Sequence, residues 1–246
     1  MQCGLCKNES VLIKKSHIIP RFMYKDLFEE DYIIIARSND LDKHKKIQTG
    51  IFEKNILCQN CDNIIIGSLE DYAKRLLYGG RLKNKPSFYR TVTRGRLKKY
   101  TLLNVDYKSL KLFILSILWR ASISKADFFR GVDLGPHEER IRKMILNHDS
   151  GPDSIYQFCM MATGSSAEVT SRLIVAPKRI KRNGNTFYAL LINQLVFLVN
   201  ISELNKLELF ENTWDPVSKT LEIPILEGKL LNKHLDGIIG TELRLS

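Results

Sequence analysis

Two Cys-x-x-Cys pairs constrain the fold of this chain more than any other feature of its sequence. Cys3 and Cys6 form the first pair, and Cys58 and Cys61 form the second. A zinc ion holds four thiolates in a tetrahedron at about 2.3 Å, and each Cys-x-x-Cys turn can supply two of them. The pairs therefore predict one structural zinc site that ties the N-terminus to residues 58–61. The alternative is two unrelated thiol pairs.

The compartment indicated by the sequence favours metal over disulfides. The chain does not start with the basic and apolar regions of a secretory signal, and its longest apolar stretch, 110–119, is too short to span a membrane. We therefore expect a soluble cytoplasmic protein, where paired cysteines bind metal rather than each other. The fifth cysteine, Cys159, lies in an apolar strand-like segment and is expected to be a buried core residue.

The charge of the chain points to a polyanionic partner. The 246 residues include 38 Lys or Arg and 27 Asp or Glu, which gives a formal net charge of +11 at pH 7. Lys and Arg gain affinity for nucleic acid by releasing counterions from its phosphates. Residues 74–99 contain ten basic residues and no acidic one, with aromatic residues among them that could stack on bases. Unless this run is an ordinary solvated surface, we expect nucleic acid to contact Arg81, Lys83, Lys85, Arg90, Arg94, Arg96, Lys98 and Lys99.

The residues between and after the two pairs resemble a known family. The segment Ser16-His17-Ile18-Ile19-Pro20 follows the first pair, and Asp62 and a helix that begins Gly67-x-x-Glu70 follow the second. This order resembles the zinc-knuckle branch of the HNH, or ββα-metal, endonucleases, over roughly residues 1–80. The resemblance implies a module in which a β-hairpin and a helix hold one catalytic divalent cation, Mg²⁺ or Mn²⁺, in addition to the structural zinc.

The resemblance also implies roles for individual residues. His17 corresponds to the general base that activates water, and Asp62 to a ligand of the catalytic cation on the helix. Asn55 is the nearest counterpart of the family's middle asparagine, and Glu70 is a further candidate ligand of the cation. Ser16 departs from the pattern, because the family has a metal-binding Asp, Glu or His before the histidine. The simpler alternatives are a packed histidine, an acidic residue that favours a helix N-terminus, and a solvated helix face.

The apolar pattern predicts an α+β fold in three consecutive regions. Residues 1–80 would form the zinc-bound HNH-like module, with 24–52 as an insertion, and residues 81–152 the basic segment and a helical region. Residues 153–246 would form an antiparallel sheet. Helices are predicted over 67–77, 107–122 and 136–147, and strands over 155–161, 169–176, 187–192 and 195–201, with a hairpin turn at Asn183-Gly184-Asn185.

The function that these features favour is metal-dependent hydrolysis of phosphodiester bonds in nucleic acid, with DNA preferred over RNA. The family resemblance makes bacterial or phage defence a natural setting. One alternative is a zinc-stabilised module that binds nucleic acid without cutting it, and Ser16 is its best argument. Another is an adaptor whose C-terminal β region binds a protein partner or a second copy of the chain. No membrane partner is expected.

Overall fold

The structure is a computed structural model that describes residues 1–24, 33–37, 40–47, 50–78, 89–94, 97–163, 173–182, 184–202 and 213–227. The chain forms two compact units and passes between them repeatedly, whereas the sequence predicted three consecutive regions. The helical unit comprises Met1–Met23, Gly50–Ser87 and Asp106–Asp153, and the sheet unit comprises Tyr24–Thr49, Phe88–Val105 and Ser154–Ser246.

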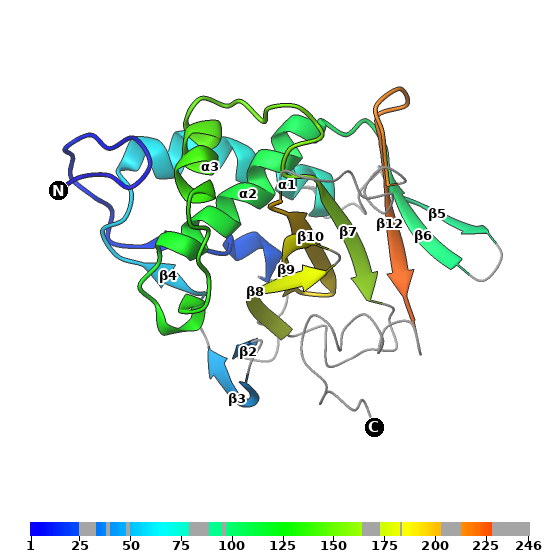
Figure 1. The fold of residues 1–246 in the computed structure, drawn as a ribbon, viewed down its shortest axis with the longest axis horizontal. Helices are drawn as coiled ribbons and strands as arrows, with labels where there is room; N and C mark the ends of the chain where they lie inside the picture. The colour runs from blue at the N-terminus through cyan, green and yellow to red at the C-terminus, as the bar shows by residue number, and fades with distance from the viewer. Residues whose placement is uncertain are drawn as a thin grey trace. The chain divides into compact units, whose positions relative to one another are not determined.

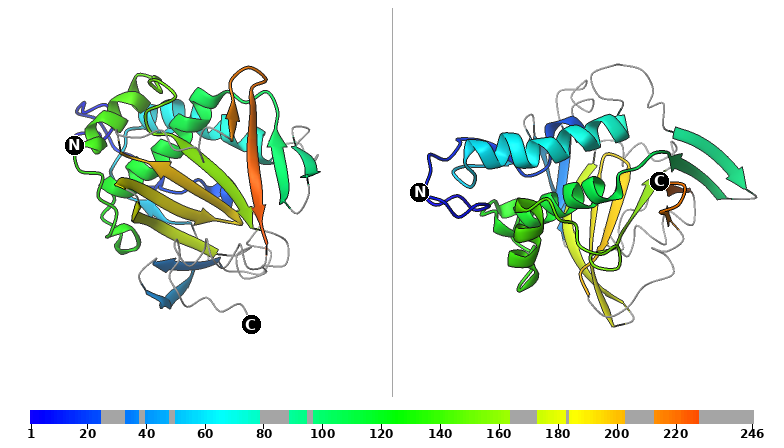
Figure 2. Two further views of the ribbon diagram at one scale, coloured as in Figure 1. Left: turned by 45° about the vertical axis from the view of Figure 1, so that its right-hand side comes forward. Right: turned by 90° about the horizontal axis from the view of Figure 1, so that it is seen from above.

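Three helices form the framework of the helical unit, and all three were predicted. The central one, α2, is apolar on nearly every side, so its side chains are buried along most of its length. The carboxylate of Asp106 caps its first turn by accepting a hydrogen bond from the Ser109 amide at 3.2 Å. Figures 1 and 2 show α1 and α3 against α2. The helices are α1 (Gly67–Tyr78), α2 (Tyr107–Ile123) and α3 (His137–Leu146).

A small two-stranded antiparallel sheet and the helix that follows its second strand complete the helical unit. Strand β1 (Ser16–His17) pairs antiparallel with β4 (Phe52–Glu53). A π-helical segment, Asn60–Ile66, then leads directly into α1. Short 3-10 turns are formed by Arg21–Met23 and Asp127–Phe129.

The sheet unit is a mixed sheet whose strands come from three parts of the chain. In the described residues its order is β3-β2-β8-β9-β10-β7-β12-β6-β5, with β11 beside β12. Neighbours are antiparallel except β2 with β8 and β12 with β7, which are parallel. The strands are β2 (Ile33–Arg37), β3 (Asp40–Ile47), β5 (Tyr89–Arg94), β6 (Leu97–Leu102), β7 (Phe158–Thr163), β8 (Leu173–Arg182), β9 (Asn185–Ile192), β10 (Leu195–Asn200), β11 (Trp214–Asp215) and β12 (Thr220–Leu226).

The predicted antiparallel arrangement of the later strands is confirmed, and the sheet is wider than predicted. Strands β8, β9, β10 and β7 follow one another in the sheet, each antiparallel to the next. The link Asn193-Gln194 has positive φ at both residues, as a tight hairpin turn of the primed type requires. Strands β2 and β3, in the predicted insertion, and β12 were not foreseen. Figure 2 shows β5 and β6 at one end of the sheet.

Apolar side chains of the central strands form the core of the sheet unit. Tyr188, Leu191 and Phe197 are fully buried, and Cys159 is 1% exposed, which confirms it as a core residue. In the part of the chain that the structure describes, the helices are too short or too polar to cross a membrane.

Candidate metal centre and polar cluster

The four paired cysteines come together in the helical unit. Their sulfur atoms all lie within 4.8 Å of one another. Thiolates bound at about 2.3 Å to a central zinc ion lie roughly 3.8 Å apart, so this gathering fits a tetrahedral site. Among the described residues, no other group of three or more His, Cys, Asp or Glu side chains gathers in this way. We call these four residues, Cys3, Cys6, Cys58 and Cys61, the cysteine cluster.

Backbone hydrogen bonds hold the two cysteine turns together. The Cys58 amide donates to the Cys3 sulfur at 3.3 Å, and the Gly4 amide donates to the Ile56 carbonyl at 2.8 Å. A Cβ atom on Gly4 would lie 2.9 Å from the same carbonyl, so only glycine fits this position. Lys7 closes the first turn in the left-handed region, with φ of 63°. The first Cys-x-x-Cys turn therefore needs its glycine for close packing against the second turn, in addition to its two sulfur ligands.

The electrostatics of the thiols favour a bound cation. Burial raises the pKa of Cys3, but hydrogen bonds from the Cys58, Cys6 and Leu5 backbones outweigh it and lower this pKa to about 7. Burial and the neighbouring thiols raise the pKa of Cys61 instead. Four thiolates at this separation repel one another, and a divalent cation between them removes the repulsion.

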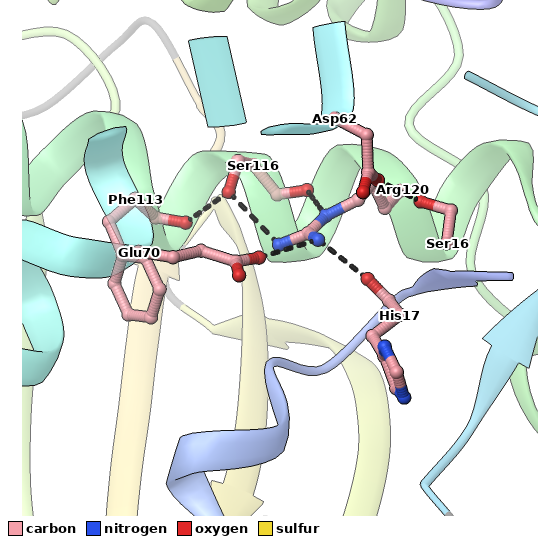
Figure 3. A network of polar contacts seen from close by, with 7 residues as sticks. All are labelled: Ser16, His17, Asp62, Glu70, Phe113, Ser116 and Arg120. Atoms are coloured by element: carbon pink, nitrogen blue, oxygen red, sulfur yellow. Dashed lines mark hydrogen bonds and ion pairs between the residues drawn. The ribbon is translucent and has the colours of Figure 1, made fainter. Parts of the chain in front are cut away.

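A second set of polar residues lies around β1 and the π-helical segment that precedes α1, and Figure 3 shows it from close by. The hydroxyl of Ser16 donates a hydrogen bond of 2.6 Å to the Asp62 carboxylate. This bond joins β1 to the π-helical segment, and Ser16 is fully buried. We call Ser16, His17, Asp62, Glu70 and Arg120 the polar cluster.

Arg120 lies at the centre of the polar cluster and comes from α2. Its guanidinium donates to the Glu70 carboxylate at 2.8 Å and to the His17 carbonyl at 2.6 Å. Its Nε donates to the Ser116 carbonyl at 3.2 Å. The Arg120 side chain is 1% exposed and that of Glu70 is 26% exposed, so this is a largely buried ion pair. Burial raises the pKa of the Glu70 carboxyl above its ordinary value, and Arg120 opposes the rise.

The imidazole of His17 points away from Arg120, whereas its carbonyl points toward Arg120 (Figure 3). The ring lies edge-on to Phe52 on the paired strand, with centroids 6.3 Å apart. Burial lowers the pKa of His17 below 6.5, and the Asp62 charge opposes this effect. An imidazole with a lowered pKa is neutral at pH 7 and can accept a proton.

Of the other two predicted site residues, Glu70 lies in the polar cluster and Asn55 does not. The Glu70 carboxylate is engaged by Arg120, as described above. Asn55 lies in the turn after β4 with φ of 57°. It lines a hollow of about 210 Å³ together with Gln2, Lys7 and Glu138, and neither His17 nor Asp62 belongs to that lining. The structure thus brings His17 and Asp62 into one cluster but not Asn55, whose predicted role stays a prediction.

Of the predicted nucleic-acid contacts, the structure describes the side chains of Lys98 and Lys99. Lys98 lies 3.2 Å from Glu227, and Lys99 pairs with Glu222. These acidic residues belong to the β12 region, so the fold offsets two charges that looked one-sided in the sequence. The side chains of Arg81, Lys83, Lys85, Arg90, Arg94 and Arg96 lie outside the described residues.

Sequence reasoning missed Arg120. A signal was present, because Arg120 is a charged residue in an otherwise apolar helix whose length is mostly buried. A buried arginine is almost always paired, so its position predicted an acidic partner. The identity of that partner could not be read from the sequence.

Comparison of the chain with protein family models, with curated proteins and with solved structures gives no match.

Proposed function

We propose that this protein is a metal-dependent nucleic-acid phosphodiester hydrolase with an HNH-like module within residues 1–80. The observation that carries the proposal is the hydrogen bond between Ser16 and Asp62. This bond joins the strand of His17 to the helix start that bears Asp62, beside the cysteine cluster. Two antiparallel strands followed by a helix, with a histidine on the first strand, form the arrangement that the resemblance implies.

The zinc requirement follows from the cysteine cluster. Cys3, Cys6, Cys58 and Cys61 would hold one zinc ion, and a closed set of four thiolates is typical of a structural site. The zinc ion would hold the N-terminal cysteine turn against the start of the π-helical segment that leads into α1. The catalytic cation is a separate ion in this proposal.

The residues present fit a catalytic cation that binds together with its substrate. Mg²⁺ is usually held by one or two carboxylates and by substrate phosphates rather than by a complete protein cage. Asp62 supplies one half-buried carboxylate, whereas Glu70 is already neutralised by Arg120. When bound, such a cation would stabilise the leaving oxygen of the phosphodiester. His17, neutral at pH 7, would take a proton from the attacking water.

A nicking assay on supercoiled plasmid tests this proposal. The protein is incubated with DNA and Mg²⁺, Mn²⁺ or no divalent cation, and His17→Ala is compared with His148→Ala. His148 is an exposed histidine of the same unit and serves as the matched control. Loss of a general base costs about 10²–10⁴-fold in rate, so His17→Ala should lose nicking and keep its zinc, while His148→Ala should cut normally.

A second variant separates the two roles. Asp62→Ala should also lose activity, and more Mn²⁺ should restore part of it, because the variant weakens cation binding and leaves the base in place. His17→Ala should not respond to added metal. If zinc-loaded, folded wild-type protein cuts neither DNA nor RNA with any divalent cation, the hydrolase proposal is wrong.

The Arg120–Glu70 pair favours a second candidate, a zinc-stabilised module that binds nucleic acid without cutting it. The guanidinium is a resident positive charge in the cluster, and a divalent cation nearby would be repelled by it. Ser16 adds a hydroxyl where the family has a stronger metal ligand. Salt-dependent binding of DNA by a protein that never nicks it would select this candidate.

A further inference from the structure

The sequence contains a second one-sided basic segment, away from residues 74–99. Between residues 169 and 202 there is no Asp or Glu, and five residues are Lys or Arg. Four of these five fall in β8, in the run Lys178-Arg179-Ile180-Lys181-Arg182. We call residues 178–189, where this run pairs with β9, the basic hairpin.

The register of the hairpin presents its charges to solvent. Arg179 pairs with Tyr188 and Lys181 with Thr186. Residues two apart on a strand share a face and lie about 6.6–6.8 Å from each other. Arg179 and Lys181 are both exposed on that face, and Lys178 is half-exposed on the other.

The basic part of β8 also lies at an edge of the sheet, as far as the described strands show. Strand β2 pairs with β8 only from Leu173 to Val175, and the register with β9 then shifts between Val175 and Lys178. Beyond that shift, β9 is the only described strand that pairs with β8. Among the described strands, the basic run is therefore an outer strand of the sheet, with β9 and then β10 on its inner side.

Within the described residues, the charges of the basic hairpin are not offset as those of β6 are. Lys98 and Lys99 have glutamate partners from the β12 region. Lys178, Arg179 and Lys181 make no ion pair with any residue in the described ranges, and neighbouring β9 carries no acidic residue. Cations without an ion-pair partner along one strand raise the local positive potential and attract a polyanion.

We propose that the basic hairpin is a binding surface for the phosphate backbone of nucleic acid. Exposed cations along one strand can contact successive phosphates, and such contacts supply the sequence-independent part of nucleic-acid binding. A membrane surface fits less well, because the two residues between β8 and β9 in the sequence, Asn183 and Gly184, offer no large apolar side chain for insertion between lipids. The choice of nucleic acid as the polyanion rests on the proposed function, whereas the surface itself follows from charge and register.

Salt-dependent binding to a labelled DNA duplex tests the proposal. The full-length variant Lys178→Gln/Arg179→Gln/Lys181→Gln is compared with Lys98→Gln/Lys99→Gln, which removes basic residues of the same unit that already have acidic partners. Each lost phosphate contact should flatten the slope of log K against log salt by about 0.9, so the triple variant should lose up to roughly 2.7. The double variant should change the slope much less. Thermal unfolding checks that both variants fold.

Three other outcomes would overturn the proposal. Basic residues on an open strand also protect it from pairing with another chain. A triple variant that binds DNA with an unchanged slope and self-associates in sedimentation would assign the charges to that protective role. Equal loss in both variants would mean that total charge alone matters. Wild-type protein that binds phosphatidylserine vesicles but not DNA would assign the surface to membranes.

The hydrolase proposal and the basic-hairpin proposal fail separately. Failure of nicking with intact DNA binding would refute the hydrolase and leave the proposed role of the basic hairpin in place.

Discussion

The cysteine cluster and the polar cluster lie in the same unit, and the sequence marked both as cation sites, yet they are built in opposite ways. The cysteine cluster gathers four ligands of one kind from two short turns. The polar cluster gathers the Asp62 carboxylate, the Ser16 hydroxyl that donates to it, and an ion pair whose positive member, Arg120, comes from α2. The cysteine cluster could hold a metal ion that offsets its charges, whereas the polar cluster already contains the guanidinium cation of Arg120.

The difference teaches that a metal site in a sequence is convincing when its ligands come as complete local turns. Each Cys-x-x-Cys turn carries its own geometry, so nothing else in the fold can easily replace a ligand. A single carboxylate on a helix is not part of a local turn that reserves it for a metal ion. A basic side chain from any other element can neutralise it, as Arg120 does to Glu70.

The largest expected effect comes from removing a ligand of the cysteine cluster. Apparent binding free energies of structural zinc are about 10–16 kcal/mol, which is comparable to the whole stability of a domain. Cys58→Ser should therefore lose about one zinc per chain and unfold much of the helical unit. Elemental analysis and circular dichroism measure these changes.

The matched control for that variant is Cys159→Ala, which alters the one cysteine outside the cluster. Cys159 is buried in β7, so the change should cost some stability and leave the zinc content unchanged. Freshly purified, folded wild-type protein without zinc would contradict the assignment of the cysteine cluster.

The next effect comes from removing the resident cation of the polar cluster. Arg120→Met leaves Glu70 without its charge partner, and breaking a buried pair from one side costs about 3–5 kcal/mol. Urea denaturation measures this loss. Arg130→Met is the control, because Arg130 pairs with Asp127 at the surface, where such pairs contribute about 0–1 kcal/mol. Equal losses in the two variants would show that Arg120 does not hold the cluster together.

A smaller effect is expected when Ser16 is converted to the kind of ligand that the family has. Ser16→Asp puts a second carboxylate against Asp62 in a buried position, and the repulsion should cost about 1–3 kcal/mol. Mn²⁺ should restore that loss, because two carboxylates form a better cation site; saturation at 100 times Kd contributes about 2.7 kcal/mol. Ser16→Ala should show no such response. Absence of any Mn²⁺ effect on Ser16→Asp would show that Arg120 keeps cations out.

The smallest effect is the titration of His17. Burial lowers its pKa below 6.5; Asp62 opposes this, whereas Arg120, Arg21 and Lys15 add to it. The folded state therefore binds the proton less tightly than the unfolded state, so this contribution to stability is present above pH 6.5 and is lost as the pH falls below it. NMR should find a midpoint below 6.5, lower still in Asp62→Asn and higher in Arg120→Met. A wild-type midpoint at or above 6.5 would contradict this placement of the ring.

The parts of the fold that could be predicted are those with local signals. Periodic apolar residues located all three helices within two residues of their observed ends. Strand-like segments and turn residues located β7, β8, β9 and β10, because hairpins are formed by neighbours in the chain. Strands β2 and β12 join the sheet through parallel partners distant in the sequence, and no local pattern announces such pairing.

The sequence by itself determined the two Cys-x-x-Cys turns and the three predicted helices, whereas the pairing of a histidine strand with an acidic helix start was implied by the family resemblance. Ligand spacing and apolar periodicity act over a few residues, so they can be read before the chain is folded. Tertiary structure alone decided that Arg120 neutralises Glu70 and that Glu222 and Glu227 offset the lysines of β6. It also left Lys178, Arg179 and Lys181 without an acidic partner among the described residues. The physical reason is that the strength of a charge depends on what lies within a few ångströms of it, and packing brings those neighbours from distant parts of the chain.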